Sequence, residues 1–195
     1  MRNLALIVLL LNPCLINAGA QIYEPLSAST RTVLQKAISD QAIAQFVTLP
    51  DAESRRWLVA MSERMEKYLP DQNEREGFLT TVHYEATRAG LDSQLVLSII
   101  HVESRFRKYA ISSAGARGYM QIMPFWIDTI GSKEHNLFHL RVNWRYGCTI
   151  FRHYLDLEKG DYFRALGRYN GSLGSATYPE MVFNAWQKNW LFTKD

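Results

Sequence analysis

One acidic residue, Glu103, stands where a general acid would be expected. On a helical wheel of about 100° per residue starting at Leu95, Ile99 lies at about 40°, Val96 at about 100° and Glu103 between them at about 80°. Its carboxyl therefore projects from an apolar stripe, in the last turn of the helix, where the helix dipole disfavours a negative charge. Both effects raise the pKa of a carboxyl, so we expect Glu103 to keep a proton that it can donate to a leaving group.

The alternative for Glu103 is a structural role. A glutamate on an apolar face can be held as a carboxylate by a nearby arginine, without taking part in chemistry. Three arginines are close enough in the sequence to do this: Arg105, Arg107 and Arg117. The helical pattern alone leaves both readings of Glu103 open.

The elements that would position Glu103 are helices. Apolar periodicity and end signals predict helices over 30–46, 51–69 and 74–89, one beginning after Asp92, and others near 124–131, 141–159, 161–168 and 178–191. Asp92 is the expected N-cap of the helix that carries Glu103, and Gly90 is the expected C′ residue of the helix before it. A stretch rich in small residues follows Glu103 and predicts turns. No alternating strand pattern and no internal repeat occur, so we expect an all-α fold.

Composition agrees with one ordinary globular domain. The chain has 195 residues, of which 47% are hydrophobic and 21% charged, with 11 Gly and 6 Pro. These values exclude a collagen-like or largely disordered chain. A formal net charge of +3 does not demand a nucleic-acid partner, and none is expected. We expect a monomer.

The first twenty residues predict a signal peptide. Arg2 precedes the apolar run Leu4–Leu11, and Ala18-Gly19-Ala20 has the pattern of a cleavage site. The apolar run is too short to cross a bilayer, which needs about 20 residues. Pro13 directly before Cys14 argues against attachment of a lipid to that cysteine. We therefore expect export to the periplasm or cell envelope without a lipid anchor.

Neither cysteine nor histidine chemistry is indicated. After cleavage, Cys148 would be the remaining cysteine, in an apolar and aromatic segment where a buried hydrophobic role is expected rather than a nucleophile. His135 and His139 are four residues apart and could share a helix face, as metal ligands do. They lack an H-E-x-x-H frame, so we expect no metal and no other cofactor.

Residues 103–124, ESRFRKYAISSAGARGYMQIMP, resemble the signature of the soluble lytic transglycosylase (SLT) domain family, E-S-x-F-x-P-x-A-x-S-x-x-G-A-x-G-L-M-Q-I-M-P. Tyr169-Asn170-Gly171 is similar to a second block of the family, A-Y-N-A-G. Asn143 and Gly147 match the family's helix between the two blocks. The resemblance covers about 90–192. It implies an all-α, lysozyme-like domain over 76–195, after a signal peptide over 1–20 and an N-terminal helical extension over 21–75.

The chain departs from the family pattern at four places. Lys108 stands where the family usually has Pro, and Tyr119 stands where it has Leu. Arg168 replaces the Ala before the Tyr-Asn pair, and Gly171-Ser172 replaces Ala-Gly. The departures bear on the shape of the sugar subsite and leave the catalytic carboxyl in place.

The resemblance implies cleavage of the β-1,4 bond between N-acetylmuramic acid and N-acetylglucosamine in peptidoglycan, with a 1,6-anhydro end as the product. Glu103 would first protonate the glycosidic oxygen and then, as a carboxylate, accept the proton of the C6 hydroxyl. The acetamido oxygen of the sugar would stabilise the positive charge between the two steps. One protein carboxyl suffices, and the sequence has no Asp or Glu between Ser104 and Asp128.

The resemblance also implies roles for five other residues. Ser112 and Gln121 would bind the N-acetyl group or ring substituents, and Met123 would pack against the sugar. Tyr169 and Asn170 would hold the acid and the adjacent ring, although Tyr169 as a core residue is the alternative. Trp126, Tyr119 and Tyr178 could line a glycan groove or fill the core. Met120 and Ile122 are expected in the core. Gly115 and Gly118 are expected to allow positive φ or a close approach of the backbone.

Two rival functions stay open. A hydrolytic muramidase, similar to goose-type lysozyme, would need a second carboxylate to activate water, with Asp128, Asp156 and Glu180 as candidates. An inactive peptidoglycan-binding module would not need an acid at all. The expected partner is the glycan strands of peptidoglycan. The sequence leaves open whether the protein remodels the wall in general or opens it for a secretion or conjugation apparatus.

Overall fold

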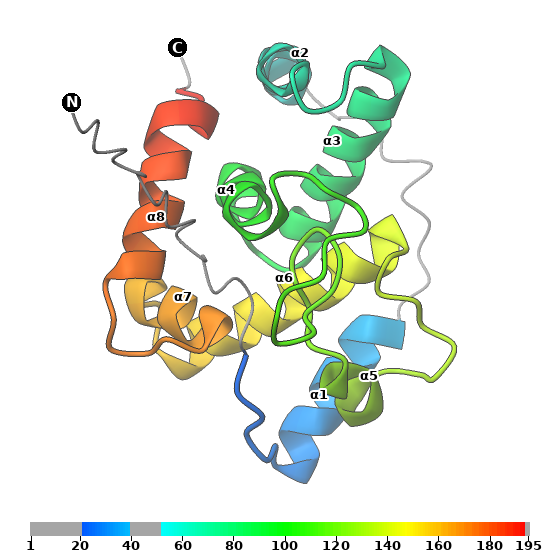
Figure 1. Ribbon diagram of the computed structural model, residues 1–195, viewed down its shortest axis with the longest axis vertical. Helices are drawn as coiled ribbons and strands as arrows, with labels where there is room; N and C mark the ends of the chain where they lie inside the picture. Colours follow the sequence, from blue (N-terminus) through cyan, green and yellow to red (C-terminus); the bar gives the residue numbers. More distant parts are fainter. Residues whose placement is uncertain (1–20, 40–51, 194–195) are drawn as a thin grey trace, which may run out of the picture.

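The computed structural model describes residues 21–39 and 52–193, and these form a helical domain (Figure 1). Its elements are α1 (Ala28–Ser39), α2 (Ala52–Met65), α3 (Gln72–Arg88), α4 (Ser93–Ser104), α5 (Phe125–Ile130), α6 (Leu140–Leu157), α7 (Tyr162–Asn170), α8 (Thr177–Ala185) and a π-helix, η2 (Trp186–Trp190). The described residues contain no strand, only isolated bridges that join Arg117 to Ile111 and Ile122. The all-α fold expected from the sequence is confirmed.

Aspartates begin three of the helices as their side chains predict. Asp71 accepts from the backbone N of Glu74 at 2.7 Å at the start of α3, and Asp161 accepts from that of Arg164 at 3.0 Å at the start of α7. Asp92 accepts from two backbone N atoms at the start of α4, which confirms its predicted role. Each carboxylate satisfies amide groups that have no partner within the first turn of a helix.

Some predicted helix ends are wrong. The helix expected over 51–69 ends at Met65, because the next residues form a turn in which the N atoms of Tyr68 and Leu69 both donate to the Met65 carbonyl. The helix expected over 178–191 is divided into α8 and η2. The prediction of a helix over 30–46 is met by α1 as far as Ser39. Its remainder, the signal peptide and Cys14 lie outside the described residues.

α4 is the central helix of the domain. It lies between α3 and α8 (Figure 1), and it packs against α3, α8 and η2. Every residue from Leu95 to Ile100 is buried, so the helix is covered on all sides, as an apolar helix of this kind must be. The long helix α6 crosses the domain and contacts α1, α3 and α7. Glu103 is therefore carried by the part of the fold that is most completely enclosed.

A buried charge cluster joins α3 to α6. Glu85 is fully buried, and Arg145 donates to both of its oxygens, at 2.7 and 3.1 Å. Arg88 donates to the same carboxylate at 3.1 Å. Removing one partner of such a cluster costs about 3–5 kcal/mol, since a buried charge is left uncompensated.

The division into an extension over 21–75 and a catalytic domain over 76–195 stays a prediction. Side chains of α1 and α2 belong to the same hydrophobic core as those of the later helices. Cys148 is fully buried, and burial raises the pKa of its thiol, which fits the predicted hydrophobic role. Within the described ranges, none of the helices combines the length and the apolar character needed to cross a bilayer.

Candidate active site

Glu103 lies in the last turn of α4 with its carboxyl almost fully enclosed, at 4% exposure. The helix ends directly after it, because Arg105 and Phe106 both adopt positive φ, 51° and 63°, and turn the chain away. Tyr178 of α8 donates its hydroxyl to Glu103 Oε1 at 2.7 Å. The other oxygen, Oε2, is buried, and none of the described residues gives it a hydrogen bond.

The environment of Glu103 keeps it protonated. Burial raises its pKa to about 8, and the hydrogen bond from Tyr178 opposes this rise only in part. Its hydrogen-bond partner is a tyrosine rather than an arginine. Arg105 and Arg117 are exposed, while Arg107 Nε donates to the Ser104 carbonyl at 3.0 Å. The enclosed carboxyl expected from the helical pattern is therefore observed, and pairing with an arginine is not seen among the described residues.

The loop over 105–124 is held in place from α6 by Asn143. The Asn143 side chain accepts from Met120 N at 2.8 Å and donates to the carbonyls of Arg117 and Leu137, both at 2.9 Å. Gly118 lies against it with φ at +77°, and a Cβ there would come within 2.5 Å of Asn143 Nδ2. The predicted need for glycine at 118 thus has both a conformational and a steric cause.

Tyr169 of α7 also holds this loop. It is fully buried, and its hydroxyl donates to the Met120 carbonyl at 2.8 Å. Met120 itself is a core residue, as predicted, and packs on Gly147, where a Cβ would come within 2.3 Å of its sulfur. Burial raises the pKa of Tyr169 well above its usual value, and the nearby charge of Glu103 adds to the rise. Tyr169 thus links the loop to the surroundings of the acid.

Ser112 and Gln121, two of the residues expected to contact sugar, use their side chains within the loop. Ser112 Oγ accepts from Ala116 N at 3.1 Å. Gln121 is 1% exposed, and its amide nitrogen donates to the carbonyls of Ala110 and Gly118 at 3.1 and 2.9 Å. Both side chains therefore shape the loop, and their contact with substrate stays a prediction.

Met123 and Asn170 belong to different elements. Met123 follows the loop and is half-buried, and Asn170 is the last residue of α7 and is buried. Their predicted roles toward the sugar are not tested by the structure. The backbone near Met123 is nevertheless occupied, because Gln21 reaches it from the start of the described chain.

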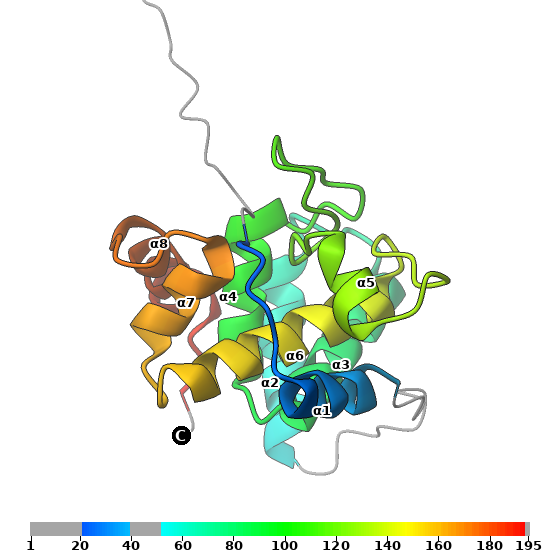
Figure 2. The same cartoon turned by 90° about the horizontal axis from the view of Figure 1, so that it is seen from below.

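Gln21 fills a position between the loop, α5 and α7. Its Oε1 accepts from Trp126 Nε1 at 3.0 Å and from Met123 N at 3.3 Å, and its Nε2 lies 3.4 Å from the Gln121 carbonyl oxygen. A further hydrogen bond from Gln21 lowers the pKa of Tyr169, against the larger effect of burial. Figure 2 shows residues 21–27 running from between α7 and α5 down across α6 to α1.

Sequence reasoning did not assign a role to either Tyr178 or Gln21. Tyr178 is separated from Glu103 by 75 residues, and it was considered only as a member of a groove or of the core. Of the other aromatic candidates, Trp126 is buried and binds Gln21, whereas the Tyr119 ring packs against Phe78 and Trp144 in the core. No local pattern marks contacts over such separations.

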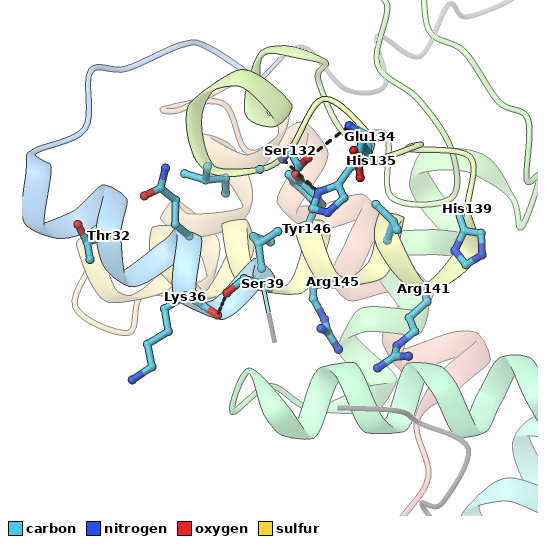
Figure 3. Close-up of a pocket in the computed structure, with 15 residues that line it drawn as sticks. Thr32, Lys36, Ser39, Ser132, Glu134, His135, His139, Arg141, Arg145 and Tyr146 are labelled. Carbon is cyan, nitrogen blue, oxygen red and sulfur yellow. Dashed lines mark hydrogen bonds between the residues drawn. The ribbon is translucent and has the colours of Figure 1, made fainter. Parts of the chain in front are cut away.

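A cavity of about 910 Å³ lies elsewhere, between α1 and α6 (Figure 3). Its lining includes neither Glu103 nor Tyr178. His135 and His139 lie on its rim, but His135 Nδ1 is 2.7 Å from the Tyr146 hydroxyl, and among the described residues no three His, Cys, Asp or Glu side chains form a group that could hold a metal ion. The chemistry of Glu103 is therefore not associated with this cavity.

Comparison with known proteins agrees with the geometry around Glu103. The family model of the transglycosylase SLT domain matches residues 80–180, which include Glu103, Tyr169 and Tyr178. The membrane-bound lytic murein transglycosylase C of Haemophilus influenzae is 36% identical over 80 residues, which are 41% of this chain and 18% of that protein. The protein of the same name from Mannheimia succiniciproducens is 45% identical over 47 residues, 24% of this chain and 13% of that protein.

The chain thus spans less than a fifth of the length of these relatives. No solved structure matches it. The family model nevertheless covers more than half of the chain, and it spans the acid together with the residues that enclose it. This chain belongs to the transglycosylase SLT domain family.

Proposed function

We propose that this protein is a peptidoglycan lytic transglycosylase that cleaves the bond between N-acetylmuramic acid and N-acetylglucosamine and leaves a 1,6-anhydro end. The observation that carries the proposal is the buried carboxyl of Glu103, which is protonated at neutral pH and is held by Tyr178. The names of its relatives, lytic murein transglycosylases, support the same activity. Export to the cell envelope, where peptidoglycan lies, is part of this proposal.

In the first step Glu103 acts as a general acid. Because Tyr178 donates to Oε1, that oxygen is an acceptor, and the acidic proton is on Oε2. Oε2 transfers this proton to the glycosidic oxygen as the bond from that oxygen to C1 breaks. The acetamido oxygen of the muramic acid residue then bonds to C1 and takes up the positive charge.

In the second step Glu103 acts as a general base. The carboxylate accepts the proton of the C6 hydroxyl, and the hydroxyl oxygen bonds to C1 as the bond from the acetamido oxygen breaks. Glu103 ends the cycle protonated, as it began, and no water is consumed. The hydrogen bond from Tyr178 stabilises the carboxylate between the steps.

The electrostatics favour this route over hydrolysis. A second carboxylate close to Glu103 would raise its pKa by charge repulsion, but the pKa of Glu103 is raised by burial. The three candidates for a water-activating base, Asp128, Asp156 and Glu180, are all exposed. Asp156 is also ion-paired with Arg152 on its own helix.

The test is digestion of purified sacculi by the wild type and by Glu103→Gln. We expect the variant to lose at least about a hundredfold in rate, since general acid catalysis contributes about 10²–10⁴-fold. Glu66→Gln, at an exposed position in the turn after α2, is the matched control and should keep full activity. Unchanged lysis by Glu103→Gln would contradict the mechanism, and absence of lysis by the wild type would favour a binding module.

Mass spectrometry of the released fragments tests the product. Anhydro ends are lighter by one water than the reducing ends that hydrolysis leaves. Reducing ends from the wild type, with loss of activity in Glu180→Gln, Asp128→Gln or Asp156→Gln, would establish the hydrolytic alternative.

A further inference from the structure

The carboxamide of Gln21 occupies a small site that is built to bind an amide. Two donors, Met123 N and Trp126 Nε1, converge on its oxygen, and one acceptor, the Gln121 carbonyl, faces its nitrogen. Gln21 is 3% exposed, so these contacts are shielded from water. An amide carbonyl and an amide N–H are also what the acetamido group of each sugar of the glycan strand presents.

This amide site lies on the loop that follows the acid-bearing helix. The Gln121 carbonyl that faces Gln21 comes directly after Met120, whose own carbonyl accepts from Tyr169. The donors and acceptor come from the loop and helix that directly follow the acid-bearing helix. A substrate amide in this place would be beside the bond that Glu103 protonates.

The end of the segment is anchored, because Leu26 packs against the core and Ser27 Oγ accepts from Thr30 N at 3.1 Å. Between this anchor and Gln21, two contacts at the surface hold it. Glu24 is paired with Arg168 Nη1 at 2.9 Å, and the Tyr23 ring meets the Phe125 ring edge-on at 5.5 Å between centroids. The Glu24 side chain is 50% exposed, so solvent and salt weaken its ion pair. Arg168 is one of the positions at which this chain departs from the family pattern.

We propose that residues 21–27 form an intramolecular plug, in which the Gln21 amide takes the place of a substrate acetamido group. The proposal rests on the proposed function, because it assigns the occupied site to glycan binding. Before a glycan strand can enter, Gln21 must leave and the pair between Glu24 and Arg168 must open. The plug competes with the glycan from within the same chain. The apparent Kd for the glycan equals the intrinsic Kd divided by the fraction of molecules in which the plug is released.

The first experiment measures binding of the trimer of N-acetylglucosamine to the exported protein, with its first residue established by mass spectrometry. A plug that is in place in about nine molecules of ten raises the apparent Kd about tenfold, so Gln21→Ala should bind the trimer about tenfold more tightly. Gln35→Ala, at an exposed position on α1, is the matched control and should bind like the wild type. Equal or weaker binding by a folded Gln21→Ala would overturn the proposal.

A second variant covers the case in which Gln21→Ala does not fold. Glu24→Gln keeps the buried amide and removes only the charge that meets Arg168, so the plug should loosen. Trimer affinity should rise by a smaller factor, and added salt should raise the affinity of the wild type but not of this variant. No change in affinity in Glu24→Gln, together with no effect of salt on the wild type, would contradict the plug.

Binding and cleavage separate this inference from the proposed function. If the function fails, the wild type and Glu103→Gln both leave sacculi intact, while Gln21→Ala still binds the trimer more tightly. If the plug fails, sacculi are cleaved in a manner that depends on Glu103, and Gln21→Ala changes neither trimer affinity nor the rate of cleavage.

Discussion

The hydrogen bond from Tyr178 makes the two oxygens of Glu103 different. Oε1 is fixed as an acceptor, whereas Oε2 has no partner among the described residues. The sequence predicted the burial of Glu103 from neighbours on its own helix, because helical spacing alone fixes which residues share a face. It could not predict Tyr178, because this contact depends on how α8 packs against α4.

The pH dependence of cleavage should follow Glu103. The acid is protonated below its pKa of about 8, so the rate should fall as the pH rises through that value. Initial rates on sacculi between pH 3 and 10 measure this fall in rate. A limb near the ordinary value of a glutamate, about 4.3, would contradict the burial of the acid in solution.

Tyr178→Phe should both slow the enzyme and shift this limb. The hydrogen bond lowers the pKa of Glu103, so its removal should move the alkaline limb to higher pH. The same bond stabilises the carboxylate that forms in the first step, and its loss, about 1.5 kcal/mol, should lower kcat about tenfold. Tyr162→Phe, on the exposed side of α7, is the control. A fall in rate with no shift of the limb would mean that Tyr178 only supports the packing.

At the scale of elements, the loop over 105–124 depends on helices that follow it in the chain. Asn143 of α6 and Tyr169 of α7 both bind the backbone of this loop, and both bind at Met120. The family signature contains these residues, but spacing alone does not reveal which backbone groups they bind. Spacing likewise did not reveal that the side chains of Ser112 and Gln121 bind backbone groups of the loop itself.

Asn143→Ala should loosen the loop. The substitution leaves the buried N–H of Met120 and the carbonyl of Leu137 without partners, whereas the Arg117 carbonyl still accepts from Ile122 N. We therefore expect a loss of about 3 kcal/mol in the free energy of unfolding. Cleavage should fall as well, because Met120 of this loop is also bound by Tyr169, which lies near the acid. Denaturant unfolding and rates on sacculi test both effects. Asn184→Ala, exposed on α8, should change neither, and a loss of less than about 1 kcal/mol in Asn143→Ala would show that the loop is held by other contacts.

The start of α4 was predictable, whereas the π-helix was not. Asp92 binds backbone N atoms two and three residues further on, and its residue type and position before an apolar run predict this role. In η2, Trp190 Nε1 donates to His101 Nδ1 at 3.1 Å, so the His101 proton is on Nε2, which faces the Tyr68 hydroxyl at 3.1 Å. These contacts join η2 to α4 and to the turn after α2, and no short stretch of sequence contains them.

At the scale of the whole molecule, segments from both ends of the described chain reach the acid or the loop that follows it. Gln21 binds Met123 and Trp126 from the N-terminal side, and Tyr178 binds Glu103 from the C-terminal side. The fold class and the burial of Glu103 were predictable because they depend on composition and on helical periodicity. The contacts that enclose the acid were not, because they join residues that are far apart in the sequence.

The burial of Glu103 has a consequence for denaturation of the domain. In the native state the carboxyl titrates at about 8, against a reference of 4.5. Between these values the native form holds a hydrogen ion that the denatured form gives up, so the stabilising effect is complete below pH 4.5 and disappears as the pH rises through 8. At pH 6.5, denaturation should liberate about one hydrogen ion from this group. The calorimetric enthalpy of unfolding should then depend on the ionisation enthalpy of the buffer, and the slope of this dependence gives the number of hydrogen ions released. In Glu103→Gln this number should be smaller by about one.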